Sequence, residues 1–587
     1  MSQPDAPHLV VLLHAYLSSP RELLHVEDVI RNAIPNAELY VPKLPLETFS
    51  LADPTEIART IVATIDERVS EREKGEHQYK DITLVGHSIG GLLVRKVYVL
   101  ANGETSDARF NYSGSGPLES AKPWAERIHR IVLLAGMNRG WSISHHMGLI
   151  RAVMMTIGVW IGNILLMVTG RPPTAFQIRR GAPFITQLRL QWIAMERRRA
   201  AENESLPEDE RKPLATVVQL LGSIDDIVSP EDNIDLVTGS GFVYLDVPKS
   251  GHQNVIEMDS THEGKARREV FTRALTEPED KLRPKCVIPA DQQPRAADAK
   301  VSDVVFVIHG IRDTGYWTQK IARCVQRAGN LPPKIYSSET STYGYFAMFP
   351  FLLFARRREK VAWLMDQYVE ARALYPNARF SYVGHSNGTY LLARALKDYR
   401  ACRFENVIFA GSVVPRRYDW YTAIGRGQVK ALLNYVATTD LVVAWFPGAI
   451  EKLRLQDLGS AGHNGFDQIT ARGGAHKDKL FQCSYVSGGH GAALREDNWE
   501  AIAHFIVHGV PKMVSQGADK PYADVLAPHR SWWVVFFGWI APLIWVAIAL
   551  LLAWAAWFIW KLPLSEWLRT LGEVAYFWVL IKIGTKI

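Results

Sequence analysis

Short apolar segments alternate with longer segments of helical periodicity along most of the chain. In the first half we predict strands at residues 8–14, 37–41, 82–86, 127–135, 215–221 and 242–247, with helices at 20–32 and 55–73. Continuous apolar strands that alternate with helices are typical of a parallel sheet with helices on both faces. The pattern therefore predicts an α/β fold for this half.

The alternation stops at residues 275–302, which are rich in Pro, Gln and charged side chains, and then begins again. In the second half we predict strands at 304–308, 406–410, 429–437 and 480–486, with helices at 316–328 and 360–374. We interpret 275–302 as a linker between two tandem α/β domains with mainly parallel sheets. The predicted domains are residues 1–274 and 303–512.

One motif occurs at the same place in each half. Gly-His-Ser-x-Gly follows an apolar segment and precedes a helix-compatible one, with its serine at Ser88 in the first half and Ser386 in the second. A serine on a sharp strand-to-helix turn needs small neighbours, and its hydroxyl is exposed at the carboxyl edge of the sheet. Both serines are therefore candidate nucleophiles.

The first half supplies partners for its serine in the order Ser, Asp, His. A nucleophilic serine needs a histidine to accept its proton and an acid to orient that histidine. Asp225 follows the predicted strand 215–221, and His252 follows the strand 242–247. The spacing of the loop favours Asp225 over its neighbour Asp226 as the acid. We predict a catalytic set of Ser88, Asp225 and His252.

The second half repeats this order. Asp440 follows the strand 429–437, and His490 follows the strand 480–486. His463 and His476 are rival bases, but both lie in glycine-rich segments without a preceding strand. Asp419 is the alternative acid. We predict a second catalytic set of Ser386, Asp440 and His490.

Acyl transfer also needs N–H donors for the oxyanion that forms on the carbonyl oxygen. One donor is the backbone N–H after the serine, and the other comes from the loop after the first strand of the domain. The predicted donors are Ile89 with Ala15 or Tyr16, and Asn387 with Gly310 or Ile311. Each of His14 and His309 either supports this loop or is an ordinary packed histidine.

These residues carry a family resemblance. The first half resembles the lipase-like α/β hydrolases that include GPI inositol-deacylases and relatives of lecithin:cholesterol acyltransferase, through the segments 86–91, 136–140 and 182–188 with Asp225 and His252. The second half resembles the α/β-hydrolase superfamily in general. Ala15 replaces a usual Gly, Met137-Asn138 replaces a common Pro-His pair, and Thr389 stands where a second Gly often follows. The resemblance implies hydrolysis of esters or thioesters, or acyl transfer, without a cofactor.

Two further segments suggest contact with a membrane. Residues 532–560 carry no charge and have tryptophans at both ends, so we predict a transmembrane helix at 531–561, followed by an amphipathic or re-entrant tail at 562–587. A cap insertion is predicted at 141–213, and within it the apolar segment 147–168 is a lid, an interfacial helix, a second span or a buried helix. Aromatic residues at 343–355 before three arginines fit either a headgroup boundary or a packed helix.

The composition of the chain limits which kinds of partner and cofactor are expected. The 587 residues carry a net charge of +7, and the four cysteines form no disulfide framework or Cys-x-x-Cys pair. No zinc spacing, phosphate-binding loop or RNA-binding signature is present, so we expect no metal, no cofactor and no nucleic acid. The N-terminus contains no readable signal peptide, which favours cytoplasmic catalytic domains. The predicted function is a membrane-anchored serine hydrolase acting on lipid-like esters; a scaffold with one inactive domain and an acyltransferase are the alternatives.

Overall fold

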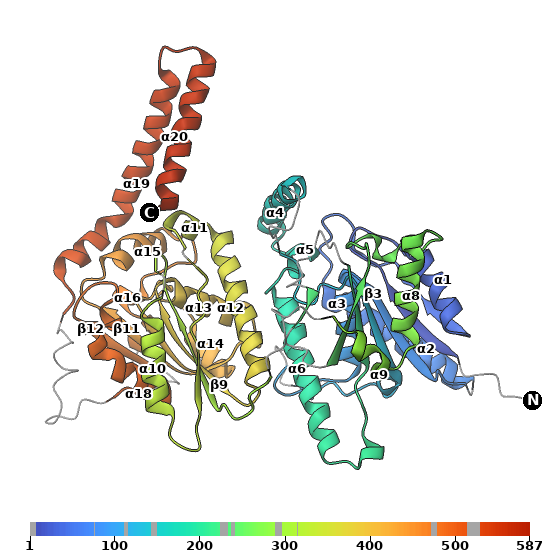
Figure 1. The fold of residues 1–587 in the computed structure, drawn as a ribbon. Helices are drawn as coiled ribbons and strands as arrows, with labels where there is room; N and C mark the ends of the chain where they lie inside the picture. The colour runs from blue at the N-terminus through green and yellow to red at the C-terminus, as the bar shows by residue number, and fades with distance from the viewer. Residues whose placement is uncertain are drawn as a thin grey trace, which may run out of the picture. The chain divides into compact units, whose positions relative to one another are not determined.

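The computed structural model describes residues 7–75, 77–110, 116–142, 149–222, 233–235, 241–287, 296–313, 315–344, 346–470, 478–512 and 529–586. The main division between two compact units falls between Ala297 and Asp298. The first unit is coloured blue to green in Figure 1 and the second yellow-green to red. Each unit contains one parallel sheet with helices packed against it, as the sequence predicts.

The first unit contains a six-stranded sheet in the order β2-β1-β3-β4-β5-β6. Its strands are β1 His8–Leu13, β2 Ala37–Tyr40, β3 Asp81–His87, β4 Ile128–Leu134, β5 Thr216–Gly222 and β6 Phe242–Val247. Its α-helices are α1 Leu24–Ala33, α2 Pro54–Lys74, α3 Ile89–Ala101, α4 Leu149–Thr169, α5 Thr174–Gln177, α6 Pro183–Glu204, α8 His262–Thr276 and α9 Glu279–Leu282. Successive residues of β1 enter separate apolar clusters on the two faces of the sheet, which explains why the strands are apolar throughout.

The second unit repeats this arrangement, with the order β8-β7-β9-β10-β11-β12 from the corresponding edge. Its strands are β7 Asp303–Ile308, β8 Tyr336–Glu339, β9 Arg379–His385, β10 Phe404–Ala410, β11 Val429–Ala437 and β12 Leu480–Val486. Its α-helices are α10 Thr318–Gly329, α11 Met348–Leu352, α12 Phe354–Leu374, α13 Asn387–Asp398, α14 Trp420–Gly425, α15 Leu441–Leu453, α16 Ala461–Asn464, α17 Asp467–Thr470, α18 Trp499–His508, α19 Trp532–Lys561 and α20 Glu566–Lys586. Leu13 pairs with Gly86 and Ile308 with Gly384, so the two sheets also share their register at the serine strand. The predicted fold of two tandem α/β units is confirmed.

The segment predicted as a linker does not leave the first unit at residue 275. Helices α8 and α9 cover 262–282, the side chain of Leu282 is fully buried in the core, and the N–H of Val287 donates to the carbonyl of Tyr244 on β6. The charged composition of this stretch reflects short surface helices with a few buried positions.

The described residues of the predicted cap insertion form the α-helices α4, α5 and α6, of which α4 is the most apolar. Its residues Met155 and Val159 pack on the core of the first unit, whereas Met154, Trp160 and Met167 are exposed. The structure therefore excludes the interpretation of 147–168 as a buried helix. Residues 143–148 lie outside the described part of the chain.

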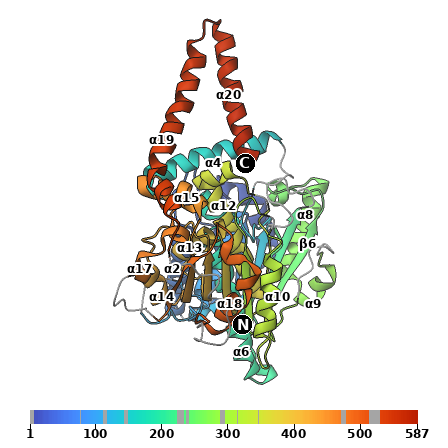
Figure 2. The same ribbon diagram turned by 90° about the vertical axis from the view of Figure 1, so that its left-hand side faces the viewer.

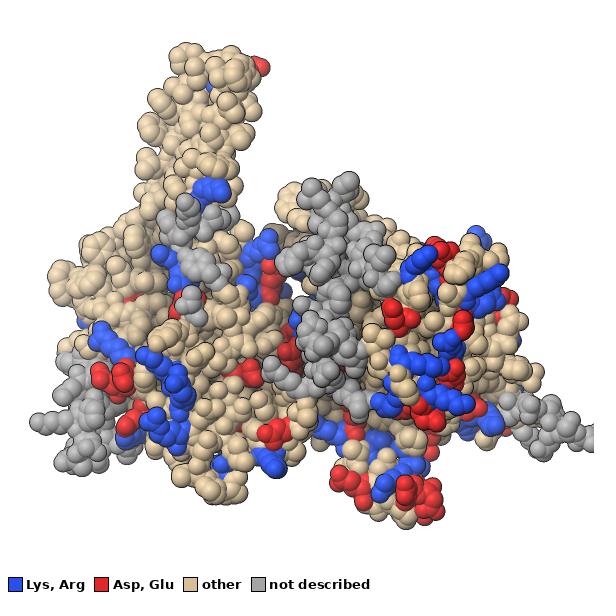
Figure 3. All heavy atoms as spheres, viewed as in Figure 1, with Lys and Arg blue, Asp and Glu red and all other residues tan. Residues whose placement is uncertain are grey.

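The predicted transmembrane segment is the single helix α19, which is long and apolar enough to cross a membrane. Figures 1 and 2 show α20 running antiparallel to α19, so that the two form a hairpin that projects from the second unit. The hydroxyl of Tyr576 on α20 donates to the carbonyl of Leu552 on α19 at 2.9 Å. In the space-filling view the visible face of the hairpin carries almost no Lys, Arg, Asp or Glu, in contrast to the charged surface elsewhere (Figure 3).

Candidate active sites

Both serine turns have the same strained geometry. Ser88 has φ 56° and ψ −117°, and Ser386 has φ 52° and ψ −117°. Conformations of this kind cost about 1–3 kcal/mol for a residue other than glycine and are concentrated at functional sites. A Cβ on Gly388 would lie 2.6 Å from the carbonyl oxygen of Ile308, so only glycine lets the helix approach the sheet here. The pattern of small residues in the motif thus has a steric cause in both units.

The first unit brings Ser88 and His252 together. His252 Nε2 lies 2.8 Å from Ser88 Oγ, and both side chains are almost fully buried. This is the distance at which imidazole accepts a serine proton. The predicted acid Asp225 and its rival Asp226 lie outside the described residues.

The second unit brings His490 and Asp440 together. His490 Nδ1 lies 3.0 Å and 3.1 Å from the two carboxylate oxygens of Asp440, whose side chain is fully buried. The carboxylate is held in turn by the N–H of Val443, since Asp440 caps the N-terminus of α15. The described residues include no hydrogen bond between Ser386 and His490; such bonds are often long before substrate binds.

The rival side chains of the second unit lie elsewhere. Asp419 caps α14 and accepts hydrogen bonds from the hydroxyl of Thr422 and from its N–H at 3.0 Å, which lower the pKa of the Asp419 carboxyl. His463 lies in α16, where burial lowers its pKa to about 4. Neither Asp419 nor His463 takes part in the hydrogen bonds between Asp440 and His490. The third rival, His476, lies outside the described residues.

The histidine before each serine has a role that the sequence did not reveal. His87 Nε2 lies 2.8 Å from the backbone carbonyl of His252, and His385 Nε2 lies 3.2 Å from that of His490. In both units this ring therefore holds the loop that carries the candidate base. The signal available in the sequence was the recurrence of histidine at this position of both motifs.

The loop after the first strand is held by its own histidine in each unit. His14 Nδ1 donates to the carbonyl of Ala15 at 2.8 Å, because its Nε2 accepts the N–H of Leu44. His309 Nδ1 makes the same contact with Gly310 at 2.8 Å. Burial lowers the pKa of both rings, which keeps them neutral and suits this bonding. The structure thus places both histidines as supports of the loop.

The second loop carries an additional polar support. The hydroxyl of Tyr343 lies 2.9 Å and 2.8 Å from the carbonyls of His309 and Gly310, and it accepts the side-chain amide of Asn387 at 3.2 Å. The Tyr343 ring also stacks on His309, with centroids 4.4 Å apart. Asn387 follows Ser386 directly, so one network joins the serine turn to the loop that carries the other predicted oxyanion donor, Gly310 or Ile311.

Tyr16 and Ile89 complete the predicted set in the first unit. Ile89 is fully buried at the start of α3, and Tyr16 is half-buried after Ala15. Burial raises the pKa of the Tyr16 hydroxyl. Only the backbone N–H groups of these residues are expected to face the oxyanion.

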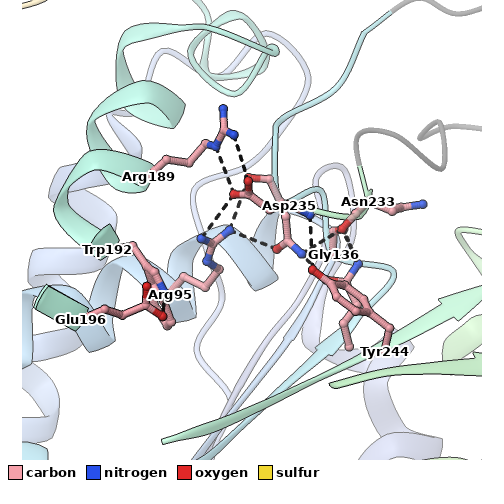
Figure 4. Close-up of polar contacts among 10 residues, drawn as sticks. Arg95, Gly136, Arg189, Trp192, Glu196, Asn233, Asp235 and Tyr244 are labelled. Atoms are coloured by element: carbon pink, nitrogen blue, oxygen red, sulfur yellow. Dashed lines mark hydrogen bonds and ion pairs between the residues drawn. The ribbon is translucent and has the colours of Figure 1, made fainter. Parts of the chain in front are cut away.

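The first unit also contains a buried ionic cluster (Figure 4). Asp235 accepts Nε and Nη2 of Arg189 at 3.0 Å and 2.9 Å, and Arg95 Nη2 lies 3.8 Å away. Arg95 Nη1 donates to Asn138 Oδ1 at 3.1 Å, and the guanidinium stacks on the ring of Trp192. The cluster joins α3, which begins after Ser88, to α6 and to the chain that follows the predicted acid loop.

The aromatic segment 343–355 is mostly packed. Tyr343, Phe346 and Phe351 are buried, and Arg357 is enclosed by the carbonyl of Phe351 and the side chain of Asp457. The headgroup-boundary interpretation is therefore wrong for most of this segment. Among the residues of this segment whose burial the structure describes, Leu353, Phe354 and Ala355 at its end are exposed apolar residues.

Within the described ranges, no group of three or more His, Cys, Asp or Glu side chains is arranged to hold a metal ion. The side chains that the structure brings into contact are Ser88 with His252 in the first unit and His490 with Asp440 in the second.

The sheet order, the strained serine turns and the histidine after the last strand of each sheet are those of an α/β-hydrolase fold. Residues 3–112 match the protein family described as "Putative serine esterase (DUF676)". This match covers the first strand, the serine turn and helix α3 of the first unit. Together these observations support an α/β hydrolase that acts on esters.

The chain is also similar to several solved structures. Phospholipase PlaB from Legionella pneumophila matches with 11% identity and a TM-score of 0.30, covering 48% of this chain and 62% of the phospholipase. The mature Bacillus licheniformis lipase BlEst2 matches with 15% identity and a TM-score of 0.26, covering 47% of this chain and 94% of the lipase. A monoglyceride lipase from Saccharomyces cerevisiae matches with 10% identity and a TM-score of 0.28, covering 49% of this chain and 89% of the lipase. The match thus spans less than two thirds of the phospholipase, and no curated protein matches the sequence.

Proposed function

We propose that the protein is a membrane-anchored serine hydrolase that cleaves carboxylic esters of lipid-like molecules. The contact that carries this proposal is the 2.8 Å approach of His252 Nε2 to Ser88 Oγ at a strained turn. Ser88 attacks the ester carbonyl while His252 accepts its proton, and the oxyanion is stabilised by the N–H of Ile89 and that of Ala15 or Tyr16. His252 then protonates the departing alcohol.

Water completes the reaction. His252 removes a proton from a water molecule that attacks the acyl-serine, and the carboxylic acid leaves with Ser88 regenerated. Asp225 is the proposed group that orients His252. In the second unit Ser386, His490 and Asp440 take the same roles, with Asn387 and either Gly310 or Ile311 as N–H donors.

The proposed substrate class rests on the apolar surfaces of the chain. The exposed apolar face of α4 and the projecting hairpin of α19 and α20 both favour contact with lipid. The surfaces of soluble proteins rarely contain exposed apolar areas of this extent. We therefore propose that the first site takes its ester from a membrane or a lipid particle, with α4 as a lid or interfacial helix.

The hairpin also suggests a topology. Because α20 returns towards the body of the second unit, both units and the C-terminus would lie on the same side of the bilayer, which we propose to be the cytoplasm. A cysteine at Leu564, between the two helices, should be shielded from a membrane-impermeant maleimide in sealed vesicles with the units outside, whereas one at the exposed Leu331 should react at once. Immediate reaction at position 564 would contradict a membrane-spanning hairpin.

The catalytic proposal is tested by active-site labelling. The full-length protein in detergent should react with a fluorophosphonate at two serines, and peptide mapping should show that Ser88→Ala and Ser386→Ala each remove one adduct. Ser18→Ala, which changes only an exposed serine bonded to Glu22, is the matched control. Absence of labelling in correctly folded protein would contradict the hydrolase proposal. Hydrolysis of short-chain esters with no preference for long chains would contradict the lipid substrate class.

A further inference from the structure

An apolar surface surrounds the base of helix α19 on the second unit. It is formed by exposed side chains of α15, of the chain just after it, and of the turn between α11 and α12. Its members are Val442, Trp445, Leu453, Leu455, Leu353 and Phe354. We call this set the anchor-base surface.

Helix α19 is packed firmly onto α15 over its first half. Val534 and Ala541 are fully buried there, and the nearest heavy atom to a Cβ on Gly538 would be Ala444 Cβ at 3.3 Å. Lys452 Nζ donates to the carbonyl of Gly538 at 2.7 Å. The ring of Trp545 lies 5.8 Å from that of Trp445 and 5.2 Å from that of Phe446. Up to Trp545, therefore, α19 is in contact with protein on one side.

The other part of the surface is continuous with α15. The side chain of Gln456 donates to the carbonyl of Leu352 at 3.2 Å and accepts Nη2 of Arg357 at 2.7 Å. These bonds hold Leu455 beside the α11–α12 turn that carries Leu353 and Phe354. Figures 1 and 2 show α15 close to the base of the hairpin, and Figure 1 shows α11 there as well.

The length of α19 determines how close a bilayer must come. From Val546 to Lys561 the helix rises about 24 Å at about 1.5 Å per residue. The hydrocarbon core of a bilayer is about 30 Å thick. A hairpin that crosses it must therefore bring the membrane down to the level of Trp545, where the anchor-base surface begins.

The candidate site of the second unit lies at the same end of the sheet. Asp440 caps the N-terminus of helix α15, and the N–H of Ser531, just before α19, donates to the carbonyl of Thr438 at 3.1 Å. On the other side, Phe351 of α11 packs edge-on against Phe346, which packs against Tyr343, the support of the loop at His309 and Gly310. The surface and the site are thus parts of one packed structure.

We infer that the anchor-base surface rests on the lipid bilayer and that the second site takes fatty-acyl ester lipids directly from that bilayer. The inference rests on the proposed membrane anchoring and on the proposed chemistry of Ser386. The substrate class of the second unit is then a fatty-acyl ester, which the motifs around Ser386 do not indicate by themselves. Bilayer contact also gives Trp445 and Leu455 a function that a soluble hydrolase would not need.

Membrane contact is tested first, without reference to catalysis. The experiment uses full-length protein in which serine replaces Cys286, Cys324 and Cys483. A bimane label is attached at Leu455→Cys or Leu353→Cys, and the protein is reconstituted into phosphatidylcholine–phosphatidylglycerol vesicles. The buried Cys402 is retained. The control is Leu331→Cys, which is as exposed as Leu455 but precedes β8 and so lies at the amino end of the strands. Doxyl lipids should quench positions 455 and 353 at least threefold more than position 331. Equal quenching, with equal access of iodide, would overturn the inference.

Substrate delivery is tested second, in a Ser88→Ala background. The double variant Leu353→Glu/Leu455→Glu should hydrolyse a long-chain ester embedded in the vesicles at least fivefold more slowly than its parent. Its labelling of Ser386 by fluorophosphonate in detergent should be unchanged, which shows that the site is intact. Leu331→Glu/Ile335→Glu, two residues of matching exposure at the amino end of the strands, should hydrolyse the vesicle ester like the parent. Parental activity in the first double variant would overturn the inference, whereas a parent in which Ser386 never labels would instead refute the proposed function.

Discussion

The two units hold the same serine turn but build different surroundings behind it. Counted from the serine, Arg95 and Lys96 of α3 correspond to Ala393 and Arg394 of α13. Arg95 and Lys96 are fully buried, whereas Arg394 reaches the carboxylates of Asp398 and Asp457 near the surface. The geometry of the turn therefore depends on the strand, the helix and the small residues, and it tolerates either charge or apolar packing beneath them.

The two units also differ in front of the serine. The first has Ala15 and Ile89 where the second has Gly310 and Asn387, and only the second has the Tyr343 network in the described residues. Both loops are held by the hydrogen bonds of a histidine, His14 or His309, and in the second unit the Tyr343 network adds further hydrogen bonds. Substitutions that exchange or remove these features test how far the two sites are equivalent.

The largest effect is expected for Asp235→Asn in the first unit. Removal of this charge leaves Arg95 and Arg189 buried together without their carboxylate, which should cost about 3–5 kcal/mol. Hydrogen exchange of the full-length protein should show lost protection in α3 and α6 and unchanged protection in α13. The control Asp467→Asn breaks an exposed pair with Arg416 and should cost at most about 1 kcal/mol. Equal costs for the two variants would show that the cluster is not energetically special.

Lys96→Met should stabilise the first unit in a pH-dependent way. Burial lowers the pKa of Lys96 to about 7, and its Nζ donates to the neutral Gln191 Oε1 at 2.5 Å. In the unfolded chain the Lys96 amine keeps its proton up to about pH 10.5. Below pH 7 both states are charged, so the folded protein is destabilised by the full cost of the buried charge. Between pH 7 and pH 10.5 the folded state is neutral, and the destabilisation decreases as the pH rises. The variant should be more stable by about 2–3 kcal/mol at pH 6.

Denaturation at several pH values checks this expectation. The gap between Lys96→Met and the parent should close as pH rises above 7. Arg394→Met, at the corresponding position of the second unit, should destabilise instead because it removes the pair with Asp398, whose oxygens lie 2.7 Å and 2.8 Å from the guanidinium. A pH-independent gap for Lys96→Met would contradict the assignment of a buried titrating amine.

The local parts of the catalytic frame follow from the sequence. Strands and turns are coded by short-range patterns, so Ser88, His252, Asp440 and His490 could be placed at the carboxyl ends of successive strands, and the structure brings the two described pairs together. Their catalytic roles remain predictions. What the sequence does not show is long-range charge pairing: no periodicity links Arg95 to a carboxylate far along the chain.

The apolar helix α19 illustrates a second limit. Hydropathy measures transfer out of water and does not distinguish lipid from an apolar protein surface. The sequence therefore predicted one uniform span, whereas the first half of α19 packs on α15. The small residues Gly538 and Ala541, at helical spacing from Val534, were the available signal of close helix packing.

Gly310→Ala should lower kcat at the second site by more than Ala15→Gly, the reverse substitution in the first unit, changes kcat at the first site. A Cβ at position 310 would lie 2.7 Å from Ser386 Cβ and 3.2 Å from its Oγ, so the loop or the serine must move. We expect kcat for Ser386 to fall about tenfold, or about 1.4 kcal/mol, in a Ser88→Ala background. Ala15→Gly in a Ser386→Ala background should change kcat less than twofold. A Gly310→Ala variant with parental kcat would show that this loop is not part of the second site.

Tyr343→Phe should have the smallest effect and the most specific one. The substitution keeps the ring that stacks on His309 and removes only the hydroxyl that lies against the carbonyls of His309 and Gly310. Loss of the hydrogen bonds of this hydroxyl should cost about 1 kcal/mol. We expect a fivefold lower kcat at Ser386 with KM nearly unchanged, because the loop is proposed to act on the oxyanion and not on ground-state binding. Asn387→Leu, which removes the amide that donates to this hydroxyl, should produce the same split, and the double variant should be no worse than either single one. If the losses in kcat of the two single variants add in the double variant, or if only KM changes, the hydroxyl merely packs the loop. The kcat of Ser88 should not change, because the loop of the first unit is held by Leu44 through His14.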